Sequence, residues 1–563
     1  MTLSRRELFF ALFFFALLTV IFTWPVVTHI RQEIPTSGQP VDPAHILYGL
    51  TSGARALAEN PLDFFNATFL YPSPLSLAFL DQIFALCLMT APLLRITGDM
   101  ILSYNVTWLA TFLFSGLGAY LLVRYLTRNR TASFLGGILY AFHPLRYHSA
   151  GILHVVGMMW IPFALLFLHM WVTEGSRRHL VLFAAFSLAQ FLSSGYTGTF
   201  LILAVLLYFL VRFFVERKAT LALLKRDRYA IVGTGLVSLL VLSPLIAPFI
   251  NNAEHLAEDT HRSIGSSALF SAVPADFITP APNSLLDAVA PAKEAARHPL
   301  FPGLIAVVLA MMWLAGRGWR DHRRRPEMIF YALLTLTGSL LALGPWLLVS
   351  ETRIPMPFAA AYYVLPGAAL IRAPVRFFVL ASLGIAVLAG AELARRRGGP
   401  GFFRSRGMGT LLIAATAFEL VAVPVALLNP LPHGVPAEYD RLIDDPTPAV
   451  IVDLPMPADE QGETLEYAFY QLYSLFHGRR LVNGVAAFVP AQTREIRRQM
   501  QEFPDGNSVQ TLQDLGVTWA FVHTELYPRE DLPALRERLA AHPSLGPLEA
   551  VAGVWVTRIG PER

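Results

Sequence analysis

Long apolar runs recur along the chain up to residue 428, and each is close to the length of about 20 residues that a helix needs to cross a bilayer. The first run, at residues 8–27, follows Arg5 and Arg6 and has no small-residue cleavage site after it. It therefore predicts a retained helix with a cytoplasmic N-terminus, in preference to a cleaved signal peptide. The remaining runs bring the expected number of spans to about eleven. They lie at residues 100–123, 131–143, 152–173, 179–194, 197–215, 229–250, 301–316, 328–349, 376–394 and 409–428.

Basic residues fall in alternate connections between these runs. Positive side chains stay on the cytoplasmic side, so every second connection is predicted to be cytoplasmic and the others to face outward. The alternation of cytoplasmic and outer connections holds along the whole chain only if the apolar segment at 75–94 does not cross the membrane. We therefore expect that segment to be a re-entrant or interfacial helix inside a long first outer loop at residues 28–99.

After residue 428 the pattern changes, because no later run is long or apolar enough to span. Short apolar stretches such as "AVIVDLP" and "TWAFVHT" alternate with polar helical segments such as "LPALRERLAAH". This alternation predicts a small α/β domain on the outer side. The expected fold is an all-α polytopic membrane domain at residues 1–428, followed by a small α/β extracytoplasmic domain at residues 429–563.

Composition supports this organisation. Of the 563 residues, 54% are hydrophobic and 15% are charged, and the mean hydropathy is +0.49, which excludes an ordinary soluble protein. The sequence pI of about 9.1 does not indicate nucleic-acid binding, because the basic residues form short clusters between apolar runs. The single cysteine, Cys87, lies in an apolar stretch and is expected to be inert packing.

The stretch "QPVDPAHILYGL" places Asp42 and His45 in the first outer loop, at the start of a predicted surface helix. One interpretation is that Asp42 caps this helix, with Pro43 in its first turn. The other is that Asp42 is a general base at the membrane surface, where it activates an acceptor hydroxyl for attack on a lipid-linked donor. The residues alone leave both interpretations open.

The order of features from Asp42 to His154 carries a resemblance. A first span, an early acid in an outer loop, the stretch "NPLDFFNATFLYPSPLSLAF" and the basic turn "RYLTRNRTASFLGGILYAFHP" follow one another. In this order the chain resembles bacterial type C glycosyltransferases, in particular multi-span proteins with an outer α/β tail. The resemblance implies transfer of a sugar from a polyprenyl-phosphate donor on the outer face of the membrane, and it implies that Asp42 is the catalytic acid.

A second acid, Asp81, lies in "LAFLDQIF" and is the other catalytic candidate. Some members of the family use two acids, or an acid with histidines, to hold a divalent cation. The spacing of the residues that would do so here specifies no metal geometry, so the sequence leaves a metal undetermined. Capping or solvated roles for the histidines are the alternative. The residues concerned are Asp42, His45, Asp81, His148 and His154.

A lipid phosphate needs fixed cations, and the planar fork of arginine suits it. Three arginines are predicted at outer helix ends: Arg146 in "FHPLRYHS", and Arg372 and Arg376 in "IRAPVRF". We count them, with His45 and His148, as candidate substrate-binding residues. Snorkelling at the interface is the alternative role for each arginine.

Two further sets of polar residues bear on function. Glu419 lies inside the last predicted span, where an ionisable side chain favours a transporter unless it forms a structural hydrogen bond with a neighbouring helix. In the tail, "QLYSLFHGRRLVNG" contains Tyr470 and His477, which suit a sugar or glycan surface and equally suit packing of the tail onto the membrane domain.

The leading hypothesis is a bacterial glycosyltransferase of the cytoplasmic membrane, with a polyprenyl-phosphate sugar as donor and a lipid, glycan or protein as acceptor. A transporter or flippase of a lipid-linked precursor is the second hypothesis, and a non-catalytic cell-envelope assembly protein is the third. The polar residues gather in the predicted outer loops rather than along the spans, which favours an enzyme of the outer face.

Overall fold

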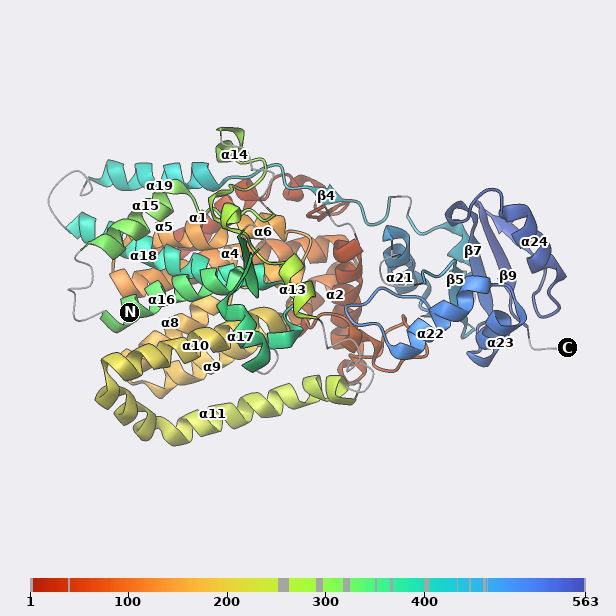
Figure 1. The fold of residues 1–563 in the computed structure, drawn as a ribbon, viewed down its shortest axis with the longest axis horizontal. Coiled ribbons are helices and arrows are strands. Elements are labelled where there is room, and N and C mark those ends of the chain that lie inside the picture. Colours follow the sequence, from red (N-terminus) through yellow and green to blue (C-terminus); the bar gives the residue numbers. More distant parts are fainter. Residues whose placement is uncertain are drawn as a thin grey trace.

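The computed structural model describes residues 4–38, 41–251, 263–289, 297–316, 325–349, 352–364, 368–398, 405–432, 434–444, 447–458, 462 and 464–560. The helices up to residue 420 form a bundle, and residues 429–560 form a smaller mixed α/β region at one end of it (Figure 1). We call this second part the C-terminal α/β region. The predicted order of a helical part followed by a small α/β part is confirmed.

Every run predicted to span contains helix. The helices up to residue 251 are α1 (Arg5–Phe22), α2 (Val41–Glu59), α3 (Phe84–Thr97), α4 (Met100–Thr127), α5 (Arg130–Ala141), α6 (Pro144–His148), α7 (Leu153–Val156), α8 (Ile161–Glu174), α9 (Arg177–Ser193), α10 (Gly195–Val215) and α11 (Arg217–Asn251). Those that follow are α13 (Ile264–Leu269), α14 (Leu285–Val289), α15 (Leu304–Ala315), α16 (Arg325–Ala342), α17 (Pro357–Val364), α18 (Phe378–Gly398) and α19 (Arg406–Leu420).

Among the described residues, five helical segments are long and apolar enough to cross a membrane, judged by length and composition. They are Met100–Thr127, Leu153–Glu174, Gly195–Val215, Arg217–Ile250 and Pro374–Gly398. Other predicted spans are shorter helices; α15 has 12 residues and α19 has 15.

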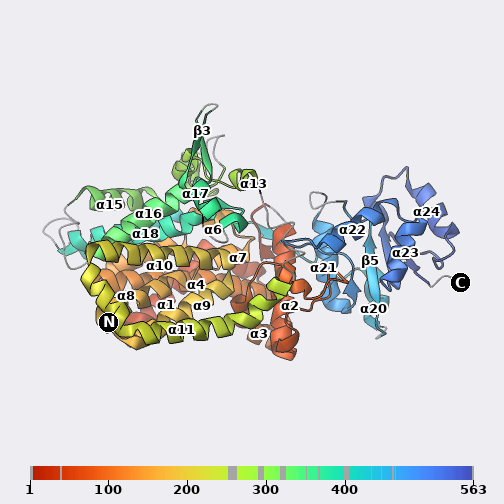
Figure 2. The same ribbon diagram turned by 60° about the horizontal axis from the view of Figure 1, so that its bottom comes forward.

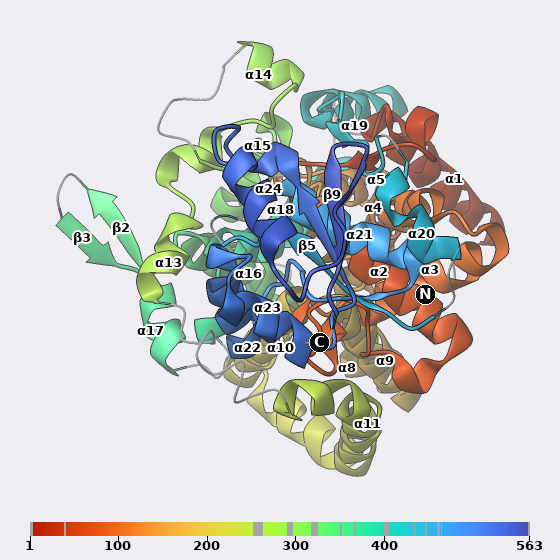
Figure 3. The same ribbon diagram turned by 90° about the vertical axis from the view of Figure 1, so that its right-hand side faces the viewer.

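The span predicted at 328–349 is wrong at its end. Helix α16 stops at Ala342, Gly344 takes a positive φ of 71°, and strand β2 (Trp346–Val349) follows. Strand β2 pairs antiparallel with β3 (Thr352–Pro355), so the apolar run continues as a hairpin instead of a helix. Figure 3 shows this hairpin projecting sideways from the bundle.

Small residues allow the bundle helices to pack closely. A Cβ on Gly116 would lie 2.5 Å from the ring of Phe15 on α1, and a Cβ on Gly137 would lie 2.3 Å from the same ring. A larger side chain at either glycine would therefore displace α1 from α4 and α5. Close packing over small residues is a common way to hold helices together where water supplies no driving force between them.

One end of the bundle, which we call the basic end, carries the N-terminus and the arginine-rich connections (Figure 1). There Glu7 of α1 accepts hydrogen bonds from Arg124 of α4 at 2.8 Å and from Arg130 of α5 at 2.7 Å. Glu392 of α18 is likewise fully buried between Arg395 and Arg396. The N-terminus and the basic connection at 124–130 therefore lie at the same end, as the charge pattern predicts.

Helices α2 and α3 lie at the opposite end, which we call the α2 end, and α2 runs across the direction of the long bundle helices (Figures 1 and 2). The segment predicted to be re-entrant or interfacial at 75–94 contains a short 3-10 turn and most of α3, a helix of 14 residues. Gly53 of α2 lets the two helices approach, because a Cβ there would lie 2.7 Å from Cys87, and Gly49 does the same for the turn before α3, where Leu80 would lie at 2.9 Å.

The C-terminal α/β region contains a five-stranded sheet in the order β6-β5-β7-β9-β8. Strands β5 (Val450–Leu454), β6 (Arg480–Leu481) and β7 (Trp519–His523) are parallel, and β8 (Glu549–Val551) and β9 (Val554–Arg558) add an antiparallel edge. The apolar run of β5 is typical of a strand buried on both faces. The connecting helices are α20 (Asp440–Asp444), α21 (Leu465–His477), α22 (Ala491–Gln499), α23 (Gly506–Asp514) and α24 (Leu532–Ala541).

Candidate functional site

The candidate site lies at the α2 end of the bundle, where Asp42 and His45 occupy the first two turns of α2. Within the described residues, the Asp42 carboxylate accepts no hydrogen bond from the start of its helix and forms no ion pair. Both ring nitrogens of His45 are buried without a hydrogen-bond partner in the same set of residues. The Pro43 ring packs against the backbone at Gly151, because a Cβ at position 151 would lie 2.8 Å from the Pro43 ring.

His154 of α7 is the centre of the charged groups. Its Nδ1 lies 3.6 Å from the Asp81 carboxylate, and the His154 side chain is 5% exposed whereas that of Asp81 is 27% exposed. Asp42, His45 and Arg376 are also within electrostatic reach of the His154 ring. The structure therefore brings together residues from four parts of the chain, three of which the sequence singles out as candidate ligands or catalysts.

Tyr196, at the start of α10, connects this histidine to the arginines. Its ring stacks on that of His154 with centroids 6.4 Å apart, and the guanidinium of Arg376 lies 4.9 Å from the Tyr196 ring centroid. The backbone N–H of Arg372 donates a hydrogen bond to the Tyr196 hydroxyl at 3.2 Å, and the Arg372 guanidinium lies over Phe270. Arg372 and Arg376 thus border the site, and stacking on aromatic faces orients both of them.

A pair of histidines forms the next part of the site. Nε2 of His148 and Nδ1 of His298 are 3.0 Å apart, so one ring donates a hydrogen bond to the other. Asp276 holds the second ring in place, because its carboxylate accepts hydrogen bonds from the backbone N–H groups of Arg297 and His298. Burial lowers the pKa of both histidines, so both rings are neutral near neutral pH.

Sequence reasoning missed Tyr196, Asp276 and His298. Each lies in a connection predicted to face outward, but none is part of a local pattern that distinguishes it from an ordinary loop residue. Their roles depend on contacts with residues about 20 to 150 positions away, a separation at which sequence periodicity carries no signal.

The structure buries Arg146 inside the bundle. Its side chain is 1% exposed, and it donates hydrogen bonds to the carbonyls of Ala141 and Val156 and to the Thr111 hydroxyl. Its guanidinium also lies 3.7 Å from the Phe112 ring centroid. All of these contacts are inside the bundle, so Arg146 is a structural residue and we do not include it among the phosphate-binding candidates.

Tyr470 and His477 also lie outside the group, because α21 carries them into the interior of the C-terminal α/β region. The ring of Tyr470 stacks on His523 with centroids 4.3 Å apart, and that of His477 stacks on Tyr439 at 5.5 Å. Both side chains are 5% exposed, and burial lowers the pKa of His477 to about 4. Their contacts match internal packing rather than an open sugar-binding surface.

The polar centre of this region is an ion pair at the carboxyl ends of β5 and β7. Nε2 of His523 lies 2.8 Å from Asp453 Oδ1, which also accepts a hydrogen bond from the Tyr439 hydroxyl. Burial alone would lower the pKa of His523, but its hydrogen bonds with Asp453 and Glu525 raise it to about 9. The imidazole is therefore charged at neutral pH.

Glu419 caps a neighbouring helix. Its Oε2 accepts a hydrogen bond from the backbone N–H of Ile305 at 3.2 Å, in the first turn of α15. Gly303 precedes that helix, and a Cβ there would lie 2.9 Å from the same oxygen. A carboxylate at a helix N-terminus satisfies free N–H groups and interacts favourably with the helix dipole.

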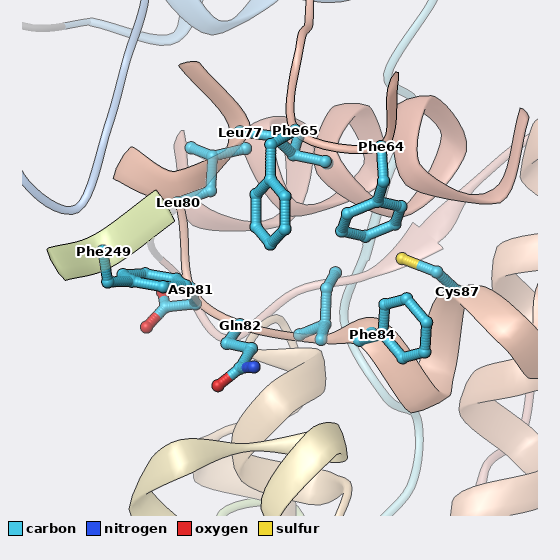
Figure 4. Close-up of a pocket in the computed structure, with 11 residues that line it drawn as sticks. Phe64, Phe65, Leu77, Leu80, Asp81, Gln82, Phe84, Cys87 and Phe249 are labelled. Atoms are coloured by element: carbon cyan, nitrogen blue, oxygen red, sulfur yellow. The ribbon is translucent and has the colours of Figure 1, made fainter. Parts of the chain in front are cut away.

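A small cavity of about 20 Å³ lies beside Asp81, between α2, α3 and the end of α11. Figure 4 shows Asp81 and Gln82 at one side of it and the rings of Phe64, Phe65 and Phe84 around it. Phe249 reaches it from α11. The surroundings of the Asp81 carboxylate are therefore mostly apolar. In the described part of the chain, no three His, Cys, Asp or Glu side chains come together in a way that could hold a metal ion.

No family model matches the chain, and no curated protein matches it in sequence. Its structure is similar to that of the arabinofuranosyltransferase AftD from Mycobacteria, with a TM-score of 0.57 at 15% identity over 100% of this chain and 40% of that chain. The oligosaccharyltransferase of Archaeoglobus fulgidus gives a TM-score of 0.47 at 13% identity over 93% and 70% of the two chains. ArnT from Cupriavidus metallidurans, bound to undecaprenyl phosphate, gives 0.43 at 15% identity over 99% and 100%.

The similarity to AftD shows that this chain has the fold of a type C membrane glycosyltransferase, which confirms the predicted resemblance. At 15% identity the similarity establishes the fold alone, and this chain spans 40% of the length of AftD. A fold hosts many activities, so the reaction has to be argued from the residues of the site.

Proposed function

We propose that this protein is a glycosyltransferase of the bacterial cytoplasmic membrane that transfers a sugar from a polyprenyl-phosphate donor to an acceptor on the outer face. The observation that carries the proposal is the Asp42 carboxylate, which has no ion-pair partner among the described residues and shares the electrostatic surroundings of His154 with Asp81 and Arg376. A carboxylate that can accept a proton and a fixed cation that can bind phosphate are the groups that transfer from a phosphate leaving group uses. The acceptor is a lipid, a glycan or a protein.

Asp42 is the general base of this proposal. The acceptor hydroxyl attacks the anomeric carbon of the donor, and Asp42 takes the hydroxyl proton as the new C–O bond forms. The bond between the anomeric carbon and the phosphate oxygen breaks, and the phosphate leaves with the electron pair. Asp81 lies 3.6 Å from Nδ1 of His154, so its proposed role is to orient that ring.

In this proposal Arg376 and Arg372 bind the phosphate of the donor. The Arg376 side chain is half-buried, its contact with Tyr196 fixes its direction, and its guanidinium donates no hydrogen bond to any described residue. A planar guanidinium with free N–H groups binds two phosphate oxygens at once, and this contact strengthens as the bond to the sugar breaks. The side chain of Arg146, by contrast, is committed to backbone carbonyls.

The proposed orientation places the basic end in the cytoplasm and the α2 end outside. It requires about eleven crossings, with the N-terminus cytoplasmic and residues 429–563 outside. The clustering of Arg124, Arg130 and Arg395 at one end of the bundle supports this orientation. The site then lies at the level of the outer headgroups, where a polyprenyl phosphate presents its charge.

Transport of a lipid-linked precursor is the other candidate, and Glu419 was the feature in its favour. The contact between Glu419 and the first turn of α15 accounts for that acid without a transport pathway. No other described residue favours transport over the proposed transfer reaction.

The proposal is tested by the turnover of purified wild type, Asp42→Asn and Asp63→Asn with a panel of polyprenyl-phosphate sugars, including slow hydrolysis to water. Asp63 is an exposed acid of the same loop and is the matched control. We expect Asp42→Asn to lose at least about 100-fold in turnover while it still binds donor. Equal turnover of all three proteins would refute the catalytic role of Asp42, and absence of turnover and of donor binding in wild type would count against a transferase.

A further inference from the structure

The C-terminal α/β region is joined to α2 at several points, although the two are more than 400 residues apart in sequence. Before α2, strand β1 (Ile34–Pro35) pairs with β4 (Leu427–Leu428), which leads into the C-terminal α/β region. After α2, the backbone N–H groups of Leu70 and Tyr71 donate to the carbonyls of Asn483 and Leu481 at 3.0 Å. The chain is therefore fastened to the C-terminal part after the helix that carries Asp42, and to the strand that leads into that part before it.

Strand β6 is the edge of the five-stranded sheet, and residues 68–71 cover it. The N–H of Leu481 in turn donates to the carbonyl of Thr68 at 2.7 Å. A sheet edge carries a row of free N–H and C=O groups, which makes such an edge a strong docking surface. Gly484 allows the close approach, because a Cβ at this position would lie 2.6 Å from the Phe69 ring.

Side chains add a second connection through three hydroxyl groups. The Tyr48 hydroxyl of α2 lies 2.8 Å from the Thr68 hydroxyl, which lies 2.7 Å from the Ser474 hydroxyl of α21. About two turns further along α2, the Arg55 guanidinium donates to the carbonyl of Leu475 at 2.7 Å. Tyr48 is fully buried, so its hydroxyl has no solvent to replace a lost partner.

Apolar contacts also join α2 to the C-terminal α/β region. Ala44, in the first turn of α2 and two residues from Asp42, is fully buried in one cluster with Tyr470, Leu481 and Val485 of the C-terminal part. The start of α2 therefore rests on the C-terminal α/β region and not only on the bundle. Figure 1 shows α2 and α21 facing each other where the two parts meet.

We infer that the C-terminal α/β region positions the active-site helix: it fixes α2, and with it Asp42 and His45, through the docked segment at 68–71 and the hydroxyl chain of Tyr48, Thr68 and Ser474. These three are positioning residues, since they act through α2. This role rests on the proposed transfer reaction for its effect on turnover, but the docking itself does not. It differs from an acceptor-binding module that moves during the reaction cycle.

A cross-link distinguishes the fixed support from the moving module. In the full-length Thr68→Cys/Ser474→Cys protein, the two new thiols replace hydroxyls 2.7 Å apart, within reach of a disulfide. Cys87, the one native cysteine, is buried. We expect the oxidised protein to retain turnover within about twofold of its reduced form, because a fixed support does not need to move. Loss of turnover on oxidation, restored by a reductant, would overturn the inference, and so would failure of the two thiols to join.

Removing one hydroxyl tests the positioning residues. Tyr48→Phe is compared with Tyr467→Phe, whose hydroxyl bonds to the Pro455 carbonyl inside the C-terminal part. We expect Tyr48→Phe to increase hydrogen exchange of the α2 amides about fivefold and to lower kcat with KM unchanged, and the control to leave both α2 exchange and kcat as in wild type. Equal effects of the two variants, or a change in KM alone, would overturn the inference. If no donor turns over, the cross-link and the exchange still decide whether the region holds α2, while the transfer reaction fails separately.

Discussion

The two ends of the helical bundle use charged residues in different ways. At the basic end, each of the buried acids Glu7, Asp227 and Glu392 is held by at least two arginines. At the α2 end, neither Asp42 nor Arg376 has an ion-pair partner among the described residues, and the Arg376 guanidinium lies over the Tyr196 ring. Removing one partner of a buried charge pair destabilises a fold, whereas a charge without a partner beside a histidine remains available for chemistry.

The largest expected effect on stability is at the basic end. Glu7→Ala leaves the buried Tyr120 hydroxyl and the largely buried Arg124 without their shared partner. We expect a loss of about 3 kcal/mol of unfolding free energy, since breaking one side of such a pair leaves an uncompensated charge. Thermal unfolding in detergent measures it, with the exposed Glu59→Ala as control. A loss no greater than that of the control would show that pairing at this end contributes little.

A smaller effect on the unfolding free energy is expected from pH in the C-terminal α/β region, where His523 and Asp453 form an ion pair. The folded pKa of His523, about 9, lies above its unfolded value of about 6.5, so its contribution is fully present below the unfolded value and is lost as the pH rises through about 9. We expect wild type to lose on the order of 2 kcal/mol between pH 7 and pH 10. His523→Gln should be less stable at pH 7 and should lack this part of the dependence; an unchanged pH profile in the variant would contradict the assignment.

At the α2 end the expected effect is on binding rather than on stability. Arg376→Gln removes the cation proposed for the donor phosphate, so donor affinity should fall about tenfold, or about 1.4 kcal/mol, with an unchanged melting temperature. Arg353→Gln, which changes an arginine that lies over Trp346 on the β2–β3 hairpin, is the matched control. Equal donor affinity of the two variants would remove Arg376 from the site.

The smallest effect on stability and turnover is expected at Glu419, whose carboxylate accepts a hydrogen bond from the Ile305 backbone. Glu419→Gln keeps an oxygen that accepts the Ile305 N–H, so the unfolding free energy should change by less than about 1 kcal/mol and turnover should not change. Loss of function in this variant, measured as transfer or as movement of a lipid-linked substrate across a vesicle membrane, would favour the transporter.

The sequence predicts those features of this molecule that depend on local patterns. The length of the apolar runs predicts the helical bundle, and the change of pattern after residue 428 predicts the α/β region. The spacing of basic residues predicts which ends of the helices lie together. Helix α16 ends before Gly344 and Pro345. The apolar pattern does not predict this end, because the apolar residues of β2 continue the run without a break.

The candidate site was only partly predictable. Asp42, His45 and Asp81 could be selected because they are polar residues near predicted helix ends in one loop. Arg146 has the same local appearance, but its carbonyl partners come from the fold and carry no side-chain signature. Tyr196 and His298 join the site through contacts over long sequence separations, which periodicity does not encode.

The most direct test of the central claim is to measure turnover and thermal stability of Asp42→Asn and Glu7→Gln in the same preparation. If Asp42 at the α2 end serves chemistry and the paired acids at the basic end serve the fold, Asp42→Asn loses turnover by at least about 100-fold and keeps the melting temperature of wild type. Glu7→Gln then shows the opposite result, with a lower melting temperature and normal turnover per folded molecule. Retained turnover in Asp42→Asn, or a drop in its stability as large as that of Glu7→Gln, would contradict the account.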